Sequence, residues 1–208
     1  MEVVVVDDNS PDQTWKIVGD ISKRNKKVHL LLRKGKRGRG LAGKDGYIYC
    51  LKNKADIIIE MDADFSHDPK YVLDMLEKIK DYDLVIGSRM VKGGKESGRG
   101  ITRKIITKLA NMYIKTMLGI KVHDCNSGYR CFRRKVLEKI NVHKLKSNGP
   151  DIVQEVLFKA HLKNFRISEI PIVFKNRTKG QSKLNMKSLL RGYFVVLHLK
   201  INKLLGRI

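Results

Sequence analysis

Two aspartates separated by one residue follow a stretch of the sequence with an apolar core. Residues 55–61 have the β-branched core Ile57-Ile58-Ile59, which predicts a buried strand, and Asp62 and Asp64 come directly after it. Carboxylates placed in this way form a hard-oxygen site of the kind that Mg²⁺ or Mn²⁺ prefers, and such an ion usually brings substrate phosphates with it. The alternative is a strand end followed by a solvated turn, since Asp, Ser and Pro all favour turns.

The elements around this pair place a further polar residue at the same edge. Residues 3–6 and 28–32 indicate strands on either side of a helix over residues 13–25, and this β-α-β order predicts a parallel sheet. Another short strand at residues 83–87 leads into Arg89. Because parallel strands end at one shared edge, Arg89 is a candidate phosphate ligand there. Its alternative is an ordinary surface position.

The composition indicates an anionic partner. The 208 residues hold 44 Lys and Arg against 21 Asp and Glu, a formal net charge of +23, which suits a nucleic acid, a phosphorylated substrate or an anionic lipid surface. Solvated lysines on helix faces are the alternative. The three cysteines have no CxxC spacing, so neither a zinc site nor a disulfide framework is expected, and a reducing cytosol fits. The sequence has no signal-peptide pattern, and no apolar run approaches the roughly 20 residues of a membrane span.

Basic residues concentrate in two further places. Residues 33–46 form a loop rich in Lys, Arg and Gly, which is open to two interpretations, a grip on phosphates or a solvated loop. Residues 186–205 predict a final helix that combines leucines and aromatics with Lys and Arg. Such a basic amphipathic helix is typical of membrane-surface contact, and the alternative is a helix packed on the core.

Five segments between residues 4 and 183 resemble, in the same order, those of the dolichol-phosphate mannosyltransferases: VVVDDNSPD, MDADFSHDP, IGSRMVKGG, NSGYR and RTKGQSK. The resemblance implies a GT-A fold, an α/β architecture with a Rossmann-like, mostly parallel sheet flanked by helices. It implies a GT-A domain over residues 1–185, followed by a basic amphipathic helix over residues 186–208. It also implies a nucleoside-diphosphate sugar donor, a polyprenyl phosphate acceptor, and Mg²⁺ or Mn²⁺ as cofactor.

The same resemblance implies roles for individual residues. The donor nucleoside is expected at Val6 and Asp8. The metal and diphosphate motif is expected at Asp62, Ala63 and Asp64, with Ser66 beside the metal. The donor diphosphate or sugar is expected to face Arg89, Arg177 and Lys183, the last two in a closing loop. The acceptor phosphate is expected at Arg103, Ser127 and Arg130. Of these, Asp64, Arg89 and Arg103 are the expected catalytic residues.

The implied reaction moves mannose from GDP-mannose to dolichyl or another polyprenyl phosphate. The acceptor phosphate is already anionic, so no strong base is needed; cations are needed to bring two anionic groups together. A single displacement inverts the anomeric carbon and gives a β-linked lipid phosphosugar. UDP-glucose or UDP-N-acetylhexosamine remains open as the donor. We expect a protein peripheral on the cytoplasmic face of a membrane, held there by its last helix or by an anchoring partner protein.

The start of the sequence departs from the family pattern. The family opens with a strand, a loop and a helix before the segment that matches residues 4–12, so the resemblance implies that a first β-α unit is missing here. We expect unpaired backbone in the sheet, weak stability and weak donor binding. Two other functions stay open, an inactive remnant and a basic nucleic-acid-binding protein. Against the latter, the sharpest motifs are acidic and no nucleic-acid-binding motif is present, so no nucleic acid partner is expected.

Overall fold

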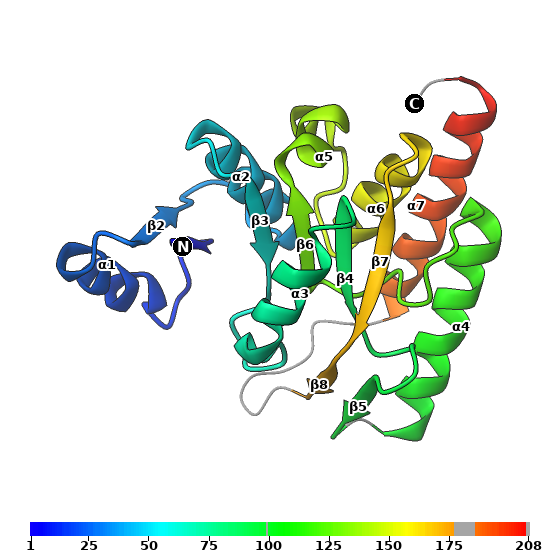
Figure 1. Cartoon of the computed structure of the whole chain (residues 1–208), viewed down its shortest axis with the longest axis horizontal. Coiled ribbons are helices and arrows are strands. Elements are labelled where there is room, and N and C mark those ends of the chain that lie inside the picture. The colour runs from blue at the N-terminus through cyan, green and yellow to red at the C-terminus, as the bar shows by residue number, and fades with distance from the viewer. Residues whose placement is uncertain (99, 177–185, 207–208) are drawn as a thin grey trace.

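The computed structural model describes residues 1–98, 100–176 and 186–206, with backbone alone for residues 186–191 (Figure 1). Its strands are β1 Val3–Asp7, β2 Val28–Leu32, β3 Ile57–Glu60, β4 Leu84–Ser88, β5 Lys95–Ser97, β6 Arg130–Arg133, β7 Ile167–Pro171 and β8 Val173–Lys175. Its α-helices are α1 Thr14–Arg24, α2 Arg39–Lys52, α3 Val72–Lys78, α4 Ile101–Leu118, α5 Arg134–Lys139, α6 Ile152–Leu162 and α7 Met186–Leu204. Two 3₁₀ turns, η1 Pro69–Tyr71 and η2 Val142–Lys144, complete the described elements.

The central sheet has the strand order β3-β6-β4-β7. β4 and β7 are parallel, and β6 is antiparallel to both of its neighbours, so β3, β4 and β7 share one direction and β6 alone opposes them. Two smaller parallel pairs, β1 with β2 and β5 with β8, lie beside it. This arrangement confirms the predicted α/β class with mostly parallel strands. It also places β7, which carries Pro171, at an edge of the central sheet, a position that suits a proline because proline cannot donate to a ladder.

Both faces of the central sheet are covered by apolar side chains. Along β4 the side chains alternate, as the pleat requires: Leu84 and Ile86 belong to the larger core with α4, α6 and α7, while Val85 belongs to a smaller cluster with Met75 of α3. Helix α6 lies deepest, because eight of its residues are buried, including Glu155. The sheet is therefore a rigid platform for the loops that leave its strands.

Two strands of the fold have an open edge. In the described part of the chain, β1 pairs with β2 alone and β3 pairs with β6 alone. Helix α2 packs against both, since it contacts β1 and β3. The N-terminal unit of α1, β1 and β2 consequently stands apart from the central sheet, at the left of Figure 1. Among the described residues, the outer edges of β1 and β3 therefore have no ladder partner.

Helices α4 and α7 lie side by side at the opposite side of the molecule (Figure 1). Their contact includes the rings of Tyr113 and Tyr193, whose centroids are 4.7 Å apart. Their outer faces nevertheless expose large apolar side chains: Ile101, Ile105, Leu109, Met112, Phe194, Leu197, Ile201 and Leu204. We call these residues the α4–α7 surface. In the portion of the chain that the structure describes, no helix is long and apolar enough to cross a membrane.

Candidate functional site

The Asp62–Ser66 turn lies where β3 leaves the sheet. It is fixed from two directions: the Asp62 backbone N–H donates to Nδ1 of His67 at 2.9 Å, and the Ser66 hydroxyl donates to Oδ1 of Asp64 at 2.5 Å. Phe65 between them has a φ of 63°, a left-handed conformation that bends the chain sharply. The turn thereby places the carboxylates of Asp62 and Asp64 and the hydroxyl of Ser66 within one short segment, as predicted.

His67 ties this turn to the rest of the fold. Its ring is 3% exposed, stacks on Tyr129 at 4.9 Å, and meets the edge of Phe174 at 5.6 Å. Burial lowers the pKa of His67 despite the nearby Asp62 carboxylate. The ring is thus neutral at neutral pH, and because Nδ1 accepts from Asp62, its proton is on Nε2. His67 is a positioning residue for the acidic turn.

An arginine of helix α2 brings a positive charge to Asp62. Nη2 of Arg39 lies 3.3 Å from Oδ1 of Asp62 and 3.2 Å from Oε1 of Glu60. The other Glu60 oxygen accepts the Tyr47 hydroxyl at 2.5 Å. Burial disfavours the charged guanidinium, but Glu60 and Asp62 outweigh it and raise the pKa of Arg39. At the end of β3, the negative carboxylates of Glu60 and Asp62 therefore both lie next to the positive guanidinium of Arg39.

This donor set fits a divalent ion that arrives with a phosphate ligand. Within residues 1–98, 100–176 and 186–206, no group of three or more His, Cys, Asp and Glu side chains is arranged to hold a metal by itself. Mg²⁺ typically uses one or two protein carboxylates and completes its shell with water and substrate phosphates. Asp62 and Asp64 supply that number of carboxylates, and the Asp62 side chain is 40% exposed. The site is thus suited to a metal–diphosphate complex rather than to a metal alone.

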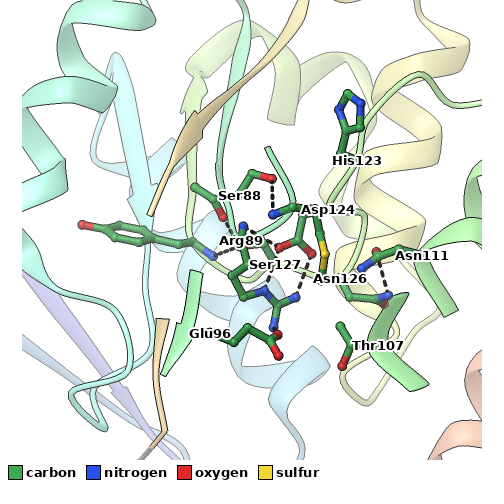
Figure 2. Close-up of polar contacts among 12 residues, drawn as sticks. Ser88, Arg89, Glu96, Thr107, Asn111, His123, Asp124, Asn126 and Ser127 are labelled. Atoms are coloured by element: carbon green, nitrogen blue, oxygen red, sulfur yellow. Dashed lines mark hydrogen bonds and ion pairs between the residues drawn. The ribbon is translucent and has the colours of Figure 1, made fainter. Parts of the chain in front are cut away.

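Arg89 occupies the middle of a buried ion cluster (Figure 2). Its Nε and Nη2 both donate to Asp124 at 2.7 Å, and its Nη1 lies 3.1 Å from Oε1 of Glu96. The ring of Phe174 lies 5.3 Å from the guanidinium carbon. Burial opposes ionisation of both partners, yet the ion pair lowers the pKa of Asp124 and raises that of Arg89. Arg89 lies at the predicted sheet edge, but its guanidinium is already paired with the carboxylates of Asp124 and Glu96.

The loop that follows α4 is held by the same cluster. Glu169 of β7 accepts the backbone N–H groups of His123 and Asp124, at 2.8 and 2.9 Å, and Nδ1 of His123 at 2.8 Å. The Ser127 hydroxyl donates to the Gly87 carbonyl at 2.5 Å. Ser127 is buried and bonded to backbone, so the structure gives it a role in loop geometry and not, in this conformation, at an acceptor phosphate.

Arg130 differs most from its predicted place. Its side chain is 0% exposed, and its three nitrogens donate to the backbone carbonyls of Ser127, Val153 and Cys125 at 2.8, 2.5 and 3.0 Å. Complete burial lowers the pKa of Arg130, although the Glu60 carboxylate opposes this. The arginine joins the loop to helix α6 from inside. It therefore has no exposed nitrogen for an acceptor phosphate, and the expectation is corrected on this point.

The first strand ends at a second polar cluster. Val6 pairs with Leu31 in the β1–β2 ladder and packs against α2 at Gly46, where a side chain would approach its Cγ2 to 3.2 Å. The carboxylate of Asp8 pairs with Arg33 and accepts the Gly38 N–H at 2.7 Å. The structure thus places Asp8 beside the N-terminus of α2, at Gly38, the residue before Arg39.

The remaining predicted residues fall in two groups. Arg177 and Lys183 lie outside the described residues. Arg103 is exposed in the first turn of α4, one turn before Thr107, whose hydroxyl donates to its carbonyl at 2.8 Å. Residues four apart share a helix face, so Arg103 and Thr107 lie in line with Asn111. Figure 2 shows Thr107 and Asn111 on the side of α4 that faces the Asn126–Ser127 loop and the Arg89 cluster.

An amide chain lies along the same face. Asn126 donates to Asn111 at 3.0 Å and accepts from Gln154 of α6 at 2.8 Å. Most buried polar side chains have at least one hydrogen-bond partner, and this chain links α4, the loop and α6.

Sequence reasoning missed several residues that shape the site. Arg39 and His67 were within segments that had been singled out, but they had no role assigned to them. Asp124 and His123 are neighbours in the sequence, but in the structure each pairs with a different partner. Glu169 gave no signal, because a lone glutamate on a strand has no distinctive spacing. An arginine between two glycines, Gly38 and Gly40, was the signal that could have identified Arg39.

Comparison with known proteins gives concordant results. The family model described as "Glycosyl transferase family 2" matches residues 1–141. A polyprenol monophosphomannose synthase of Mycolicibacterium smegmatis is 34% identical over 198 residues, which cover 94% of this chain and 75% of that protein. An undecaprenyl-phosphate mannosyltransferase of Micrococcus luteus is 37% identical over 184 residues, 88% of this chain and 76% of that protein.

Solved structures share the fold. A glucosyl-3-phosphoglycerate synthase from Mycobacterium tuberculosis, in complex with Mn²⁺, UDP and phosphoglyceric acid, superposes with a TM-score of 0.68 at 18% identity, over 96% of this chain and 67% of that one. The same enzyme without those ligands in its description superposes with a TM-score of 0.58 at 16% identity, over 98% and 68%. At these identities the likeness concerns the fold alone.

Proposed function

Because this chain belongs to glycosyl transferase family 2 and has the GT-A fold of such enzymes, we propose that it transfers a mannosyl group from GDP-mannose to the phosphate of a polyprenyl lipid. The observation that carries the proposal is the Asp62–Ser66 turn at the end of β3, in a chain 34–37% identical to two proteins named for polyprenyl-phosphate mannosyl transfer. A glycosyltransferase with this turn has the carboxylates needed for a nucleoside-diphosphate donor.

On the donor side, the proposed metal ligands are Asp62 and Asp64, with Ser66 holding the Asp64 carboxylate and Ala63 between them. When bound, Mg²⁺ or Mn²⁺ would neutralise the diphosphate as it leaves. Val6 and Asp8 would lie along the nucleoside, and Arg177 and Lys183 would add cations to the phosphates. Arg89 is enclosed by Asp124 and Glu96. It would act on the donor indirectly, by positioning the protein segments around the donor.

On the acceptor side, we assign the lipid phosphate to Arg103. It is exposed at the start of α4, and its helix also carries part of the α4–α7 surface. A guanidinium at that point would bind the phosphate bidentately and orient one oxygen towards the anomeric carbon. No side chain is required as a strong base, since the nucleophile is already an anion. Attack opposite to the diphosphate would invert the anomeric carbon and give a β-linked lipid phosphosugar.

The location that follows from this acceptor is a membrane surface, on its cytoplasmic face. The α4–α7 surface would lie on the bilayer, and Lys104, Lys108 and Lys115 of α4 are exposed next to its apolar residues. Apolar residues flanked by lysines favour the interface of an anionic bilayer. An anchoring partner protein would serve the same purpose.

A lipid-extraction assay tests the proposal. The purified chain is incubated with Mn²⁺, polyprenyl phosphate and labelled GDP-mannose, with UDP-glucose and UDP-N-acetylhexosamine in parallel, and label is counted in the organic phase. We expect label that requires GDP-mannose, metal and lipid together. Label from a UDP-sugar alone would change the donor, and label without lipid phosphate or metal would contradict the proposal.

A pair of variants makes the assay specific to the acidic turn. Asp64→Ala removes one proposed metal ligand, and we expect transfer to fall by at least about 100-fold. Asp74→Asn, an exposed position on α3, removes the same charge elsewhere and should leave transfer unchanged. Full activity of the Asp64 variant would refute the assignment of the metal to this turn.

A further inference from the structure

Arg39 is placed where a metal bound to the acidic turn would compete with it. Its Nη2 lies 3.3 Å from Oδ1 of Asp62, and the same nitrogen is 3.2 Å from Glu60. Asp62 is one of the two carboxylates assigned to the metal. A divalent cation on that carboxylate and a guanidinium 3.3 Å from it would repel each other, since like charges a few ångströms apart are unfavourable even near the surface.

The Arg39 guanidinium also has an N–H donor that is available to an anion. Nη1 of Arg39 is buried and has no hydrogen-bond partner among the described residues. A buried donor without an acceptor is costly, and the arginine fork is suited to a phosphate, which can accept two N–H groups at once. The unfilled donor lies beside the carboxylates at which the diphosphate of the donor would be held.

The guanidinium of Arg39 lies close to the backbone at Gly128. A Cβ added to Gly128 would lie 2.4 Å from Nη2 of Arg39, so the glycine in the Asn126–Arg130 loop is what allows the guanidinium to reach Asp62. Because the obstructed atom is the end of a flexible side chain, a methyl group there would displace the guanidinium and leave the backbone in place. Two positions, far apart in sequence, therefore control the same ion pair.

We propose that Arg39 takes the place of the divalent cation at Asp62 when the donor is absent, and that it becomes a ligand of the donor diphosphate when the metal binds. The proposal rests on the proposed function, because it assumes that Asp62 is a metal ligand. Its consequence is that metal and nucleoside diphosphate assist each other: the metal displaces Arg39 from Asp62, and the diphosphate accepts the displaced guanidinium.

Two binding measurements on the complete chain test this. Mn²⁺ affinity is measured without nucleotide from the loss of the free Mn²⁺ electron paramagnetic resonance signal. GDP affinity is measured in the presence of saturating Mn²⁺ by calorimetry. For Arg39→Leu we expect opposite changes: Mn²⁺ binds about three- to fivefold more tightly, because its competitor is gone, and GDP binds at least about threefold more weakly. A purely structural arginine would weaken both or neither.

Three further variants complete the design. Gly128→Ala should tighten Mn²⁺ binding as Arg39→Leu does, since it moves the guanidinium away from Asp62. Arg24→Leu, an exposed arginine near the end of α1, is the matched control and should change neither affinity. If Arg39→Leu fails to fold by circular dichroism, Gly128→Ala and Arg39→Lys, whose shorter fork-less cation reaches only one carboxylate, decide the Mn²⁺ arm.

The outcomes distinguish this proposal from the proposed function on which it rests. If Asp64→Ala abolishes Mn²⁺ binding while Arg39→Leu and Gly128→Ala leave it unchanged, the metal site stands and the role of Arg39 is overturned. If the unaltered chain binds no Mn²⁺ either with or without GDP, the metal assignment falls, and the role of Arg39 falls with it. Tighter Mn²⁺ and weaker GDP binding in the same Arg39 variant would support both.

Discussion

The buried ion pair between Arg89 and Asp124 supports the site structurally. The two side chains are 7% and 0% exposed and form two hydrogen bonds of 2.7 Å, with Glu96 as a third partner. Charges are costly to bury unless each is paired and hydrogen-bonded, and removal of one partner leaves the other uncompensated. Asp124 also begins the loop that carries Ser127 and Arg130, so the pair determines where that loop lies.

We predict that Asp124→Asn destabilises the fold by about 3 kcal/mol at neutral pH. The amide keeps the shape of the side chain but loses the charge that balances Arg89. The free energy of unfolding, measured by urea denaturation at pH 7, checks the value. Asp81→Asn, an exposed aspartate outside any ion pair that the structure describes, is a suitable comparison and should change the free energy by less than about 0.5 kcal/mol.

The same pair predicts a pH dependence. The ion pair with Arg89 lowers the pKa of Asp124 below the ordinary carboxyl value of about 3.9. A depressed carboxyl pKa contributes stability above the unfolded-state pKa, and that contribution is lost as the pH falls through the folded-state value. The difference in unfolding free energy between the chain and Asp124→Asn should therefore be constant from pH 5 to 7 and shrink below about pH 4. A difference that persists unchanged at pH 3 would contradict the ionic explanation.

At this scale the sequence was informative where function depends on a short segment. Asp62, Asp64 and Ser66 could be predicted because one strand end determines their geometry. The contacts of Arg39 with Asp62, of Arg89 with Asp124 and of Glu169 with His123 could not, since they join residues 23, 35 and 46 positions apart. Arg130 was misplaced for a related reason: an arginine in a motif suggests a ligand, and only the packed structure shows three backbone carbonyls around it.

Two helices, α4 and α7, expose large apolar side chains, although the sequence directed attention to the last helix alone. The predicted contact of residues 186–208 with a membrane was based on α7, but α4 exposes Ile105, Leu109 and Met112 beside it. The inner side of the pair is packed, since Ile114, Leu118, Val196 and Leu199 are buried. Both alternatives weighed for the final helix thus describe part of it: one face belongs to the core and the other faces outward.

We predict that Phe194→Asp weakens binding to vesicles containing anionic phospholipid by at least about fivefold, because it replaces an apolar side chain with a charge at the bilayer interface. Phe194 is 68% exposed, so the fold should tolerate the change. Leu73→Asp, at a 74% exposed position on α3, is the control. Co-sedimentation with vesicles measures both, and equal loss in the two variants would contradict a defined α4–α7 surface.

Most elements were predictable because their periodicity is local. The expected helix over residues 13–25 and the strand at residues 28–32 agree with α1 and β2 to within one residue. Strand β6 was missed, although it lies between β3 and β4, because its sequence Arg-Cys-Phe-Arg has a charge at each end and only four residues. Its burial depends on Arg130 being satisfied by carbonyls from elsewhere. Strand β5 is short and polar and forms because β8 pairs with it.

The molecule as a whole has two parts of unequal stability. Helix α1 has no buried residue, and every residue of β2 is only partly buried, whereas β4 is buried throughout. A two-stranded sheet is marginal by itself. The unit of α1, β1 and β2 therefore depends on its contact with α2, while the central sheet has helices on both faces.

We predict that hydrogen exchange will show this division. Amides of β1 and β2 should exchange through local opening at a lower free energy than amides of β4 and β6, because fewer apolar contacts hold them. Exchange followed by mass spectrometry at neutral pH resolves the segments. Addition of GDP and Mn²⁺ should slow exchange in β1 if Val6 and Asp8 contact the donor. Uniform protection across both parts would show that the open edges carry no energetic cost.

The open edge of β1 also governs how the purified chain behaves in storage. Val3–Val6 presents four valines in succession, without a charge until Asp7, and an exposed, uncharged edge strand is a template for cross-β growth between molecules. The net charge of +23 keeps copies apart at low ionic strength. Salt screens that repulsion within about 10 Å at 0.1 M. High salt, a usual remedy for handling basic proteins, will therefore promote the aggregation of this one.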